Sequence, residues 1–190
     1  AIEESRYDVP GFFVHPVQDE AVMAGNGTIG LELVEELGEI DTVLIPWGGG
    51  GLTNGIASAL AVLSPTTRVV VCEPETGAPV SASLAAGHPV TVAYTPSFVD
   101  GAGSKALLPA MWERARSLVS GSDTATLEEA AAAVRFLVER ARVVAEGAAA
   151  LPVATALSGR VGAGRIVCIV SGGNIDLSRL TAILAGRVPG

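Results

Sequence analysis

The sequence is very poor in lysine and in aromatic residues. Lys105 is the only lysine among the 190 residues, and aromatic residues make up 4% of the chain. The net charge is −8, and no run of lysine and arginine occurs. A negatively charged chain without a basic patch is poorly suited to bind the phosphate backbone of nucleic acids or an anionic membrane surface. We therefore expect neither a nucleic acid nor a membrane among its partners.

Long hydrophobic runs and a signal peptide are also missing. No apolar stretch reaches the roughly 18 residues of a membrane span, and the first residues, AIEESRYDVP, do not resemble a signal peptide. The two cysteines, Cys72 and Cys168, each lie within an apolar run. This position is typical of buried small side chains, with a disulfide or a zinc site as the alternative. These features favour a cytoplasmic protein.

The residues that are present predict an α/β fold with an open, mostly parallel sheet and helices on both faces. Short β-branched runs, apolar on both sides as buried parallel strands are, predict strands at 42–46, 68–72 and 165–170, with 12–15 as a further candidate. Longer Ala- and Leu-rich segments predict helices at 20–37, 52–63, 79–86, 106–118, 127–142, 147–157 and 177–184. Thr126 and Glu129 match a capping box at the start of the fifth helix. Alternation of strands and helices with short connections predicts one compact domain.

Four consecutive glycines, Gly48, Gly49, Gly50 and Gly51, separate the predicted strand TVLIP from the predicted helix LTNGIASAL. The first backbone N–H groups of a helix lack partners inside the helix, and the helix dipole is positive there. An anion, above all a phosphate, is therefore the expected occupant. The alternative, a slack linker, does not suit a position between a buried strand and a helix.

Three kinds of phosphate site compete for this loop. A P-loop requires a lysine after the glycines, and none follows them. The dinucleotide fingerprint G-x-G-x-x-G fails because Thr53 or Asn54 stands where the third glycine is needed. Glu73, at the end of the next strand, nevertheless lies where a ribose-binding acid would be, so a dinucleotide site remains the alternative. The third kind is a site that holds a small phosphorylated cofactor mainly by backbone groups.

A second motif, SGGN at 171–174, follows the last predicted strand. Ser171 stands at the carboxyl end of that strand, where ligands bind in open α/β sheets. Its hydroxyl can meet a heteroatom, and the glycines leave room for a flat ring. An ordinary strand–helix turn with a Ser or Asn cap is the alternative for this motif taken alone.

Together these stretches resemble the threonine/serine dehydratase and serine racemase family, which are pyridoxal-phosphate enzymes of fold type II. The matching motifs, in family order, are HPVQDEAVMAGNGTIGLEL, IPWGGGGLTNGIA, FVDG, ARVVAEGAAAL and IVSGGNIDL. The resemblance implies that pyridoxal 5'-phosphate is the cofactor. It also implies which residues bind this cofactor, namely Gly48, Gly49, Gly50, Gly51, Leu52, Ser171, Gly172, Glu146 and Gly101.

The resemblance assigns these residues different parts of the cofactor. The backbone N–H groups of 48–52 would hold the phosphate, and Ser171 would share a hydrogen bond with the pyridine nitrogen. Glu146 and Gly101 would line the cofactor side of the pocket. Some family members also bind a divalent cation, for which Glu73 is a weak candidate, because Pro79 stands where the second acid is needed. We expect no metal site, and we expect Glu73 to cap the sheet edge or to pair with an arginine.

The family's lysine that holds the cofactor, and the loop that grips the substrate carboxylate, belong to N-terminal segments absent from this sequence. Lys105 stands where the family often has a non-catalytic lysine, so we expect no catalytic residue in this chain. The expected organisation is the end of a small domain at 1–16 and the large cofactor-binding domain at 17–190. The chain would be the C-terminal part of the enzyme, inactive without the lysine-bearing half.

The whole enzyme would convert threonine or serine to a 2-oxo acid and ammonia, as a homo-oligomer. Three alternatives stay open at this point. The enzyme could be serine racemase-like or another fold type II pyridoxal-phosphate enzyme. The chain could be a non-catalytic cofactor-binding chain, or it could be a nucleotide-binding domain.

Overall fold

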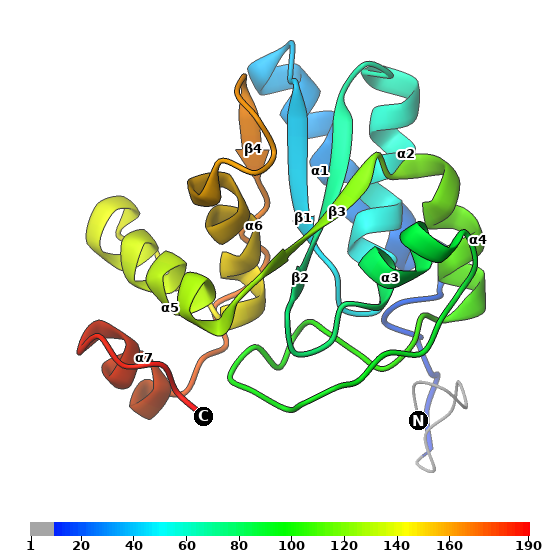
Figure 1. The fold of residues 1–190 in the computed structure, drawn as a ribbon. Helices are drawn as coiled ribbons and strands as arrows, with labels where there is room; N and C mark the ends of the chain where they lie inside the picture. Colours follow the sequence, from blue (N-terminus) through cyan, green and yellow to red (C-terminus); the bar gives the residue numbers. More distant parts are fainter. Residues whose placement is uncertain (1–9) are drawn as a thin grey trace.

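The computed structural model describes residues 10–190, and at its centre lies a sheet of four parallel strands. The strands are β1 (Thr42–Pro46), β2 (Arg68–Pro74), β3 (Gly121–Ala125) and β4 (Ile166–Cys168), in the order β3–β2–β1–β4. The chain runs outward from β1 to β3 and then returns to place β4 on the other side of β1 (Figure 1). The strand order therefore reverses between β1 and β4, the place where open α/β sheets form a crevice at their carboxyl ends.

Helices connect the strands and cover both faces of the sheet, as the sequence predicts (Figure 1). They are α1 (Glu20–Leu37), α2 (Gly51–Leu63), α3 (Pro79–Ala86), α4 (Pro109–Leu118), α5 (Leu127–Phe136), α6 (Gly147–Ser158) and α7 (Leu177–Leu184), and a short π-helix, η1 (Leu137–Ala141), extends α5. Within residues 10–190, no helix is long and apolar enough to cross a membrane.

The strand side chains alternate between two apolar layers. Leu44, Val70 and Cys72 pack with residues of α5, α6 and α7. Val43 and Ile45 point the other way and pack with residues of α1 and α2. Because both faces of the central strands β1 and β2 are covered, most of their residues are apolar, and these residues form continuous hydrophobic runs in the sequence.

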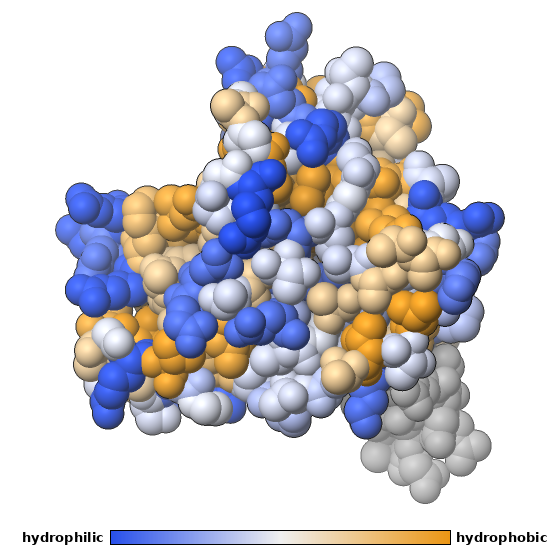
Figure 2. All heavy atoms as spheres, viewed as in Figure 1, coloured by the Kyte–Doolittle hydropathy of each residue, from blue (hydrophilic) through white to orange (hydrophobic). Residues whose placement is uncertain are grey.

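Apolar surface remains on the side of the molecule where α5 and α7 lie (Figure 2). The large hydrophobic side chains that these two helices expose are Phe136, Leu177 and Leu184. Leu177, at the start of α7, is 80% exposed. The outer surfaces of α5 and α7 thus keep exposed apolar side chains, whereas the sheet is covered by helices.

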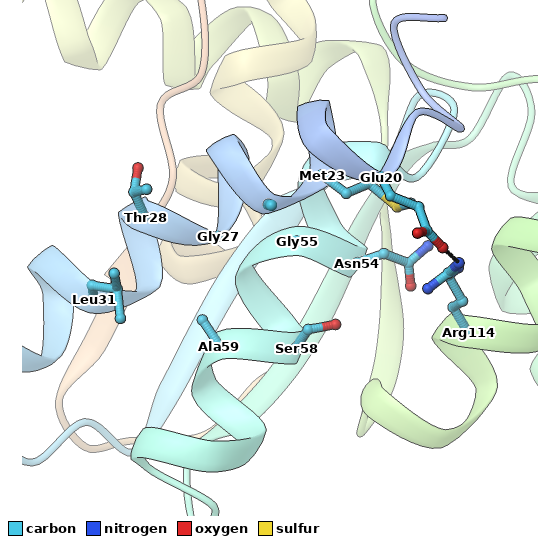
Figure 3. A pocket seen from close by; sticks show the side chains of 11 residues that line it. Glu20, Met23, Gly27, Thr28, Leu31, Asn54, Gly55, Ser58, Ala59 and Arg114 are labelled. Carbon is cyan, nitrogen blue, oxygen red and sulfur yellow. Dashed lines mark hydrogen bonds and ion pairs between the residues drawn. The ribbon is translucent and has the colours of Figure 1, made fainter.

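Helices α1 and α2 cross closely because small residues line their contact (Figure 3). A Cβ atom on Gly55 would collide with the backbone oxygen of Met23, and one on Gly27 would lie 3.2 Å from the backbone oxygen of Gly55. A Cβ atom on Gly30 would lie 2.9 Å from that of Ala59. This contact fixes the direction of α2, and its first turn carries the glycine loop.

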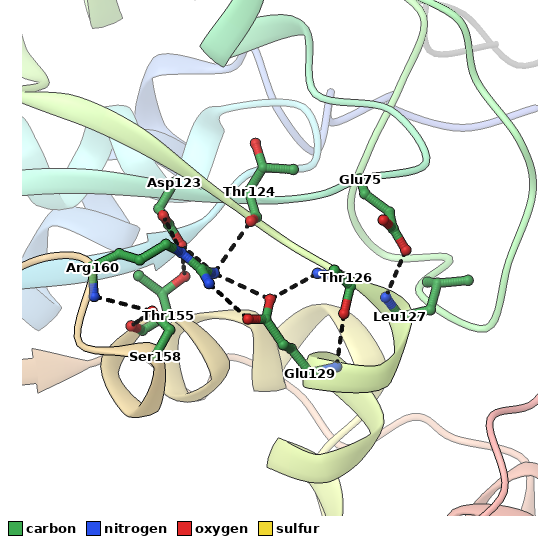
Figure 4. Close-up of polar contacts among 9 residues, drawn as sticks. All are labelled: Glu75, Asp123, Thr124, Thr126, Leu127, Glu129, Thr155, Ser158 and Arg160. Atoms are coloured by element: carbon green, nitrogen blue, oxygen red, sulfur yellow. Dashed lines mark hydrogen bonds and ion pairs between the residues drawn. The ribbon is translucent and has the colours of Figure 1, made fainter.

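Arg160 ties the end of β3 to the start of α5 and to the loop after α6 (Figure 4). Its guanidinium lies 2.8 Å from a carboxylate oxygen of Asp123 and 2.6 Å from one of Glu129. Glu129 also completes the predicted capping box with Thr126. The hydrogen bonds from Arg160 to Glu129 lower the pKa of this carboxyl and raise the pKa of Arg160.

Several element boundaries differ from the sequence predictions. Residues 12–15 form no strand, and the strand at Gly121–Ala125 was missed. The helix predicted from 106 begins at Pro109, and the one predicted to reach 142 changes to a π-helix after Phe136. The strand GSDTA was missed because it is polar and lies at the sheet edge, so it lacks the hydrophobic run of a central strand.

Candidate functional site

The glycine loop joins the carboxyl end of β1 to the first turn of α2. Gly50 has a left-handed backbone with φ of 95°, which turns the chain into the helix. The N–H groups of residues 48–53 donate no hydrogen bond to another described residue. A series of free N–H groups at a positive helix end is an anion site ready for use.

Neighbouring groups leave almost no room for a side chain on these glycines. A Cβ atom on Gly48 would lie 2.6 Å from the backbone oxygen of Gly101, and one on Gly51 would lie 2.8 Å from that of Val17. A Cβ atom on Gly50 would lie 2.5 Å from the indole of Trp47. Glycine is therefore required at these positions because the neighbouring backbone and Trp47 leave no space for a side chain. The absence of side chains also lets a ligand approach the backbone of the loop.

Val17 is a part of the site that the sequence did not reveal. Its side chain packs against Gly49, where a Cβ atom would lie 2.5 Å away. His15 fixes this segment, because its Nδ1 accepts hydrogen bonds from the N–H groups of Val17 (3.1 Å) and Gln18 (2.9 Å). His15 is buried, so the His-Pro motif acts here as a turn that presses Val17 onto the glycine loop.

A cavity of about 210 Å³ opens in front of the glycine loop. It brings together most of the residues predicted to bind the cofactor, and its full lining consists of Pro16, Val17, Asn26, Pro46, Gly48, Gly49, Gly50, Gly51, Leu52, Gly101, Glu146, Ala148 and Ser171. The cavity lies at the carboxyl ends of β1 and β4, where the strand order reverses. Gly172 does not line it directly but lies next to Glu146.

Ser171 reaches the cavity from the end of β4, and its hydroxyl makes no hydrogen bond with a described residue. Glu146 reaches it from the start of α6 and accepts a hydrogen bond from the N–H of Asn174 at 3.1 Å. A free hydroxyl, a carboxylate and the free N–H groups of the glycine loop thus border the same cavity. Lys105 is exposed and is not among the lining residues.

Glu73 lies away from this cavity and has a structural role. Its carboxylate is fully buried and accepts hydrogen bonds from the N–H groups of Val80 and Ser81, both at 2.8 Å, at the start of α3. The hydroxyl of Ser122 donates a further bond at 3.1 Å. Burial nevertheless raises the pKa of Glu73. Because both carboxylate oxygens already accept hydrogen bonds, and no described cluster of acidic, His or Cys residues surrounds it, Glu73 is not placed as a metal ligand.

The cysteines are free thiols inside the protein. Burial raises the pKa of Cys72 to about 12 and that of Cys168 to about 11. A thiol with such a pKa is protonated at neutral pH and is a poor nucleophile or metal ligand. Neither cysteine takes part in the site.

A larger hollow of about 470 Å³ lies between α1, α2 and α4, away from the glycine loop (Figure 3). Its walls are mostly small or apolar, with an ion pair of Glu20 and Arg114 at 2.6 Å on the rim. Asn54 at its edge donates to the carbonyl of Met111 at 3.2 Å, which fixes the orientation of the amide, and its Oδ1 has no partner among the described residues. This hollow holds none of the free N–H groups at the start of α2, so the smaller cavity is the candidate site.

Comparison with known proteins identifies the family. The family model of the pyridoxal-phosphate dependent enzymes matches residues 3–172. The chain belongs to this family. Pyridoxal phosphate is therefore the cofactor implied for the cavity, and neither the P-loop nor the dinucleotide interpretation of the glycines is needed.

Relatives within the family are named as threonine ammonia-lyases. The chain is 39% identical over 174 residues to the L-threonine ammonia-lyase of Geobacter sulfurreducens, and the match covers 90% of this chain and 43% of that protein. It is also 39% identical to the catabolic L-threonine dehydratase TdcB of Escherichia coli K12, with 90% and 53% covered. The chain thus spans about half the length of the curated relatives it matches.

Solved structures of the same family share the fold. The crystal structure of a threonine deaminase from T.th. superimposes with a TM-score of 0.81 at 36% identity, over 86% of this chain and 61% of that one. The maize serine racemase gives a TM-score of 0.81 at 32% identity, over 91% and 56%. The predicted α/β fold of a fold type II pyridoxal-phosphate enzyme is therefore confirmed.

The residues of the cavity fit this cofactor. Its phosphate requires several hydrogen-bond donors at one end, which the free N–H groups of the glycine loop provide. Its flat ring requires an approach without side chains, which Gly101 provides. The ring nitrogen requires a small polar partner, and the free hydroxyl of Ser171 in the cavity lining would suit it.

Proposed function

We propose that this chain supplies the cofactor site of a pyridoxal-phosphate dependent ammonia-lyase that converts threonine or serine to a 2-oxo acid and ammonia. The observation that carries the proposal is the cavity in which the glycine loop, Gly101, Glu146 and Ser171 meet. The names of the relatives support the reaction and the substrate class. Threonine is favoured over serine by the names of the curated relatives.

In this proposal the bound cofactor serves as an electron sink for a substrate carbon that loses its proton. The chain's own residues bind and orient it. The N–H groups of 48–52 hold the phosphate, so the ring is directed toward β4. Ser171, a neutral hydroxyl, meets the ring nitrogen without supplying a full negative charge. Gly101 allows the ring to lie flat against the backbone.

The chain does not supply the amine that attaches the cofactor. Lys105 lies outside the cavity, and no other lysine exists in this sequence. We infer that a lysine from another segment of the protein enters the cavity and also serves as the base that moves the substrate proton. A homo-oligomer in the cytoplasm and the division into a small domain at 1–16 and a large one from 17 belong to the same proposal. The first nine residues lie outside the described part.

A second candidate is racemisation of serine, because the maize serine racemase matches this chain as well as the threonine deaminase does by TM-score. Both reactions begin with removal of the same proton, so the cofactor site described above serves either one. The difference must arise from groups that act on the substrate after that step.

A chimera tests the proposed activity. The N-terminal portion of TdcB that precedes the matched region would be fused to this chain, and L-threonine and L-serine would be supplied with pyridoxal phosphate. We expect ammonia and a 2-oxo acid in equal amounts, with loss of both when Gly50 is replaced by Ala. A chimera that is folded and holds the cofactor, yet releases no ammonia from either amino acid, would rule out the lyase proposal. Formation of D-serine without ammonia would favour the racemase.

A further inference from the structure

The glycine loop is held in shape by groups outside it. Four consecutive glycines have great backbone freedom, and the N–H groups of 48–53 donate no hydrogen bond to another described residue. Hydrogen bonds from these groups therefore do not hold the loop in place. A mobile loop loses its freedom when it binds a phosphate, which weakens the binding, whereas a loop that is held in shape beforehand avoids this loss.

Val17 contacts the loop at two of its four glycines. A Cβ atom on Gly49 would lie 2.5 and 2.9 Å from the two methyl carbons of Val17. A Cβ atom on Gly51 would lie 2.8 Å from the carbonyl oxygen of Val17 and 3.1 Å from its Cα atom. The side chain of Val17 also packs against the apolar cluster that contains Trp47. Val17 is thus fixed between this cluster and the glycine loop.

His15 holds Val17 in this place through one ring nitrogen. Nδ1 of the buried ring accepts hydrogen bonds from the N–H groups of Val17 at 3.1 Å and of Gln18 at 2.9 Å. Backbone N–H groups can only donate, so Nδ1 serves as the acceptor of both bonds. Asn and Asp side chains make the same kind of turn when they accept from the N–H two residues further along the chain. His15 thus fixes the turn that directs Val17 onto the loop.

We propose that His15, acting through Val17, holds the glycine loop in the shape that leaves its N–H groups free for a phosphate. His15 is a positioning residue: its acceptor nitrogen fixes the turn, and the turn fixes Val17. Val17 in turn limits the positions open to Gly49 and Gly51. The inference rests on the proposed function only for the identity of the ligand, because all of these contacts are made within the chain itself.

Two replacements of His15 separate its hydrogen-bond acceptor from its bulk. Asn keeps an acceptor oxygen attached to Cγ, as Nδ1 is in His, but it is smaller. Leu fills more of the space but accepts no hydrogen bond. The full chain and both variants would be titrated with inorganic phosphate and, separately, with pyridoxal phosphate. The backbone amide NMR signals of 48–52 would be recorded before any ligand is added.

We expect His15→Leu to bind both ligands at least about threefold more weakly than the unmodified chain, because two hydrogen bonds no longer hold the turn. Its amide signals at 49 and 51 should be shifted already without ligand. His15→Asn should stay within about twofold of the unmodified chain, because it keeps the acceptor. If His15 only filled space, Asn would be the more damaging replacement. His88→Leu, at the exposed second histidine outside the cavity, is the control and should change neither affinity.

A second set of variants tests the contact between Val17 and the loop. Gly49→Ala places a methyl group against the side chain of Val17 and should weaken the binding of phosphate. Val17→Ala removes the two methyl carbons that this group meets, so the double variant should bind phosphate more tightly than Gly49→Ala alone. Gly50→Ala is the matched control, because its Cβ atom would meet Trp47 instead. Val17→Ala should restore no affinity there.

Either set of variants can overturn the inference. A folded His15→Leu variant with the phosphate affinity of the unmodified chain refutes the role of His15. A double variant that binds phosphate no better than Gly49→Ala refutes the role of Val17, and this comparison holds even if His15→Leu does not fold. If the unmodified chain binds neither ligand, the proposed function is wrong. The amide signals without ligand then decide the positioning role, and signals at 49 and 51 that are equal in His15→Leu and the unmodified chain refute it.

Discussion

Ser171 is the residue that we propose meets the ring nitrogen of the cofactor. It stands at the end of β4, lines the cavity and makes no hydrogen bond with a described residue. A serine there leaves the ring nitrogen with a neutral partner, whereas an aspartate would favour its protonated form. In the proposed site, the ring nitrogen would therefore have one neutral partner from this chain.

Replacement of Ser171 by Ala is expected to weaken the binding of pyridoxal phosphate by about 0.5–1.5 kcal/mol, since one neutral hydrogen bond is lost. The affinity for inorganic phosphate is expected to stay the same, because phosphate occupies only the glycine loop. Equilibrium titrations of the variant with both ligands measure the two effects. An equal loss for phosphate and for the cofactor would show that Ser171 acts on the loop rather than on the ring.

At the scale of single residues, those that stand in sequence motifs come together in one cavity, and their roles toward the cofactor stay a prediction. The glycines at 48–51, Gly101, Glu146 and Ser171 meet in one cavity, as the resemblance implied. Val17 was missed because its contact with Gly49 joins two segments far apart in the sequence. Hydrophobic patterns place a residue on an element but do not tell which distant backbone it touches.

The contact between α1 and α2 shows how an element is placed. These helices pack through glycines, so the backbones come close enough to orient the first turn of α2 toward the cavity. A side chain in this contact would separate the two helices and rotate the glycine loop. The packing of α1 against α2 therefore affects both the stability of these helices and the position of the glycine loop.

Replacement of Gly55 by Ala is expected to lower the free energy of unfolding by about 1–3 kcal/mol, because the new Cβ atom collides with the backbone oxygen of Met23. Gly25→Ala is the matched control: it lies in α1, with no atom within 4 Å of the position that its Cβ would take, and should stabilise the protein by up to about 1 kcal/mol. Urea unfolding followed by circular dichroism measures both. Two variants of equal stability would contradict the close crossing.

The ion pair of Arg160 with Glu129 predicts how α5 responds to acid. Arg160 lowers the pKa of Glu129, so this carboxylate contributes stability above its ordinary pKa of 4.5 and loses it as the pH falls through the lowered value. Glu129→Gln should reduce the free energy of unfolding by about 1 kcal/mol at pH 7. It should also make the decline of stability below pH 4.5 shallower.

Urea unfolding at pH 7 and at a pH of about 3.5 measures this change. Glu113→Gln is the control, because Glu113 pairs with Arg116 on the exposed surface of α4. The control should keep the acid dependence of the unmodified chain. An unchanged acid slope in Glu129→Gln would show that the pair does not contribute to stability.

The bounds of the strands buried on both faces were predicted closely. The strand at the sheet edge and the π-helix at the end of α5 were not predicted. The strands at the centre of the sheet carry continuous apolar runs, so their positions follow from the sequence. The edge strand at Gly121–Ala125 is polar because only part of it faces the core, and the π-helix after Phe136 depends on how α5 ends. Such local irregularities follow from packing and not from periodicity.

The candidate site follows from one feature of the sheet topology. β4 returns to the side of β1 opposite β2, which places the SGGN turn next to the glycine loop. Alternation of strands and helices predicted a parallel sheet, but the strand order could not be derived from alternation alone.

The reaction as a whole requires more than the described chain. The chain spans about half of the curated relatives, and its cavity holds no lysine. The chain alone should therefore bind the phosphate and ring of the cofactor without attaching it covalently. Borohydride reduction followed by peptide mapping should find no adduct on Lys105.

The central claim is that the free N–H groups of the glycine loop hold the phosphate of pyridoxal phosphate. The most direct measurement is a titration of the isotopically labelled chain with pyridoxal phosphate, followed through its backbone amide NMR signals. We predict saturable shifts concentrated at 48–52 and at Ser171, which are absent in Gly50→Ala. In that variant the new methyl group would meet Trp47, and the left-handed backbone at φ of 95° would be strained. Gly38→Ala, which also changes a glycine of positive φ but in open space, should keep the shifts. Signals that do not move at 48–52, or that move only elsewhere, would contradict the account.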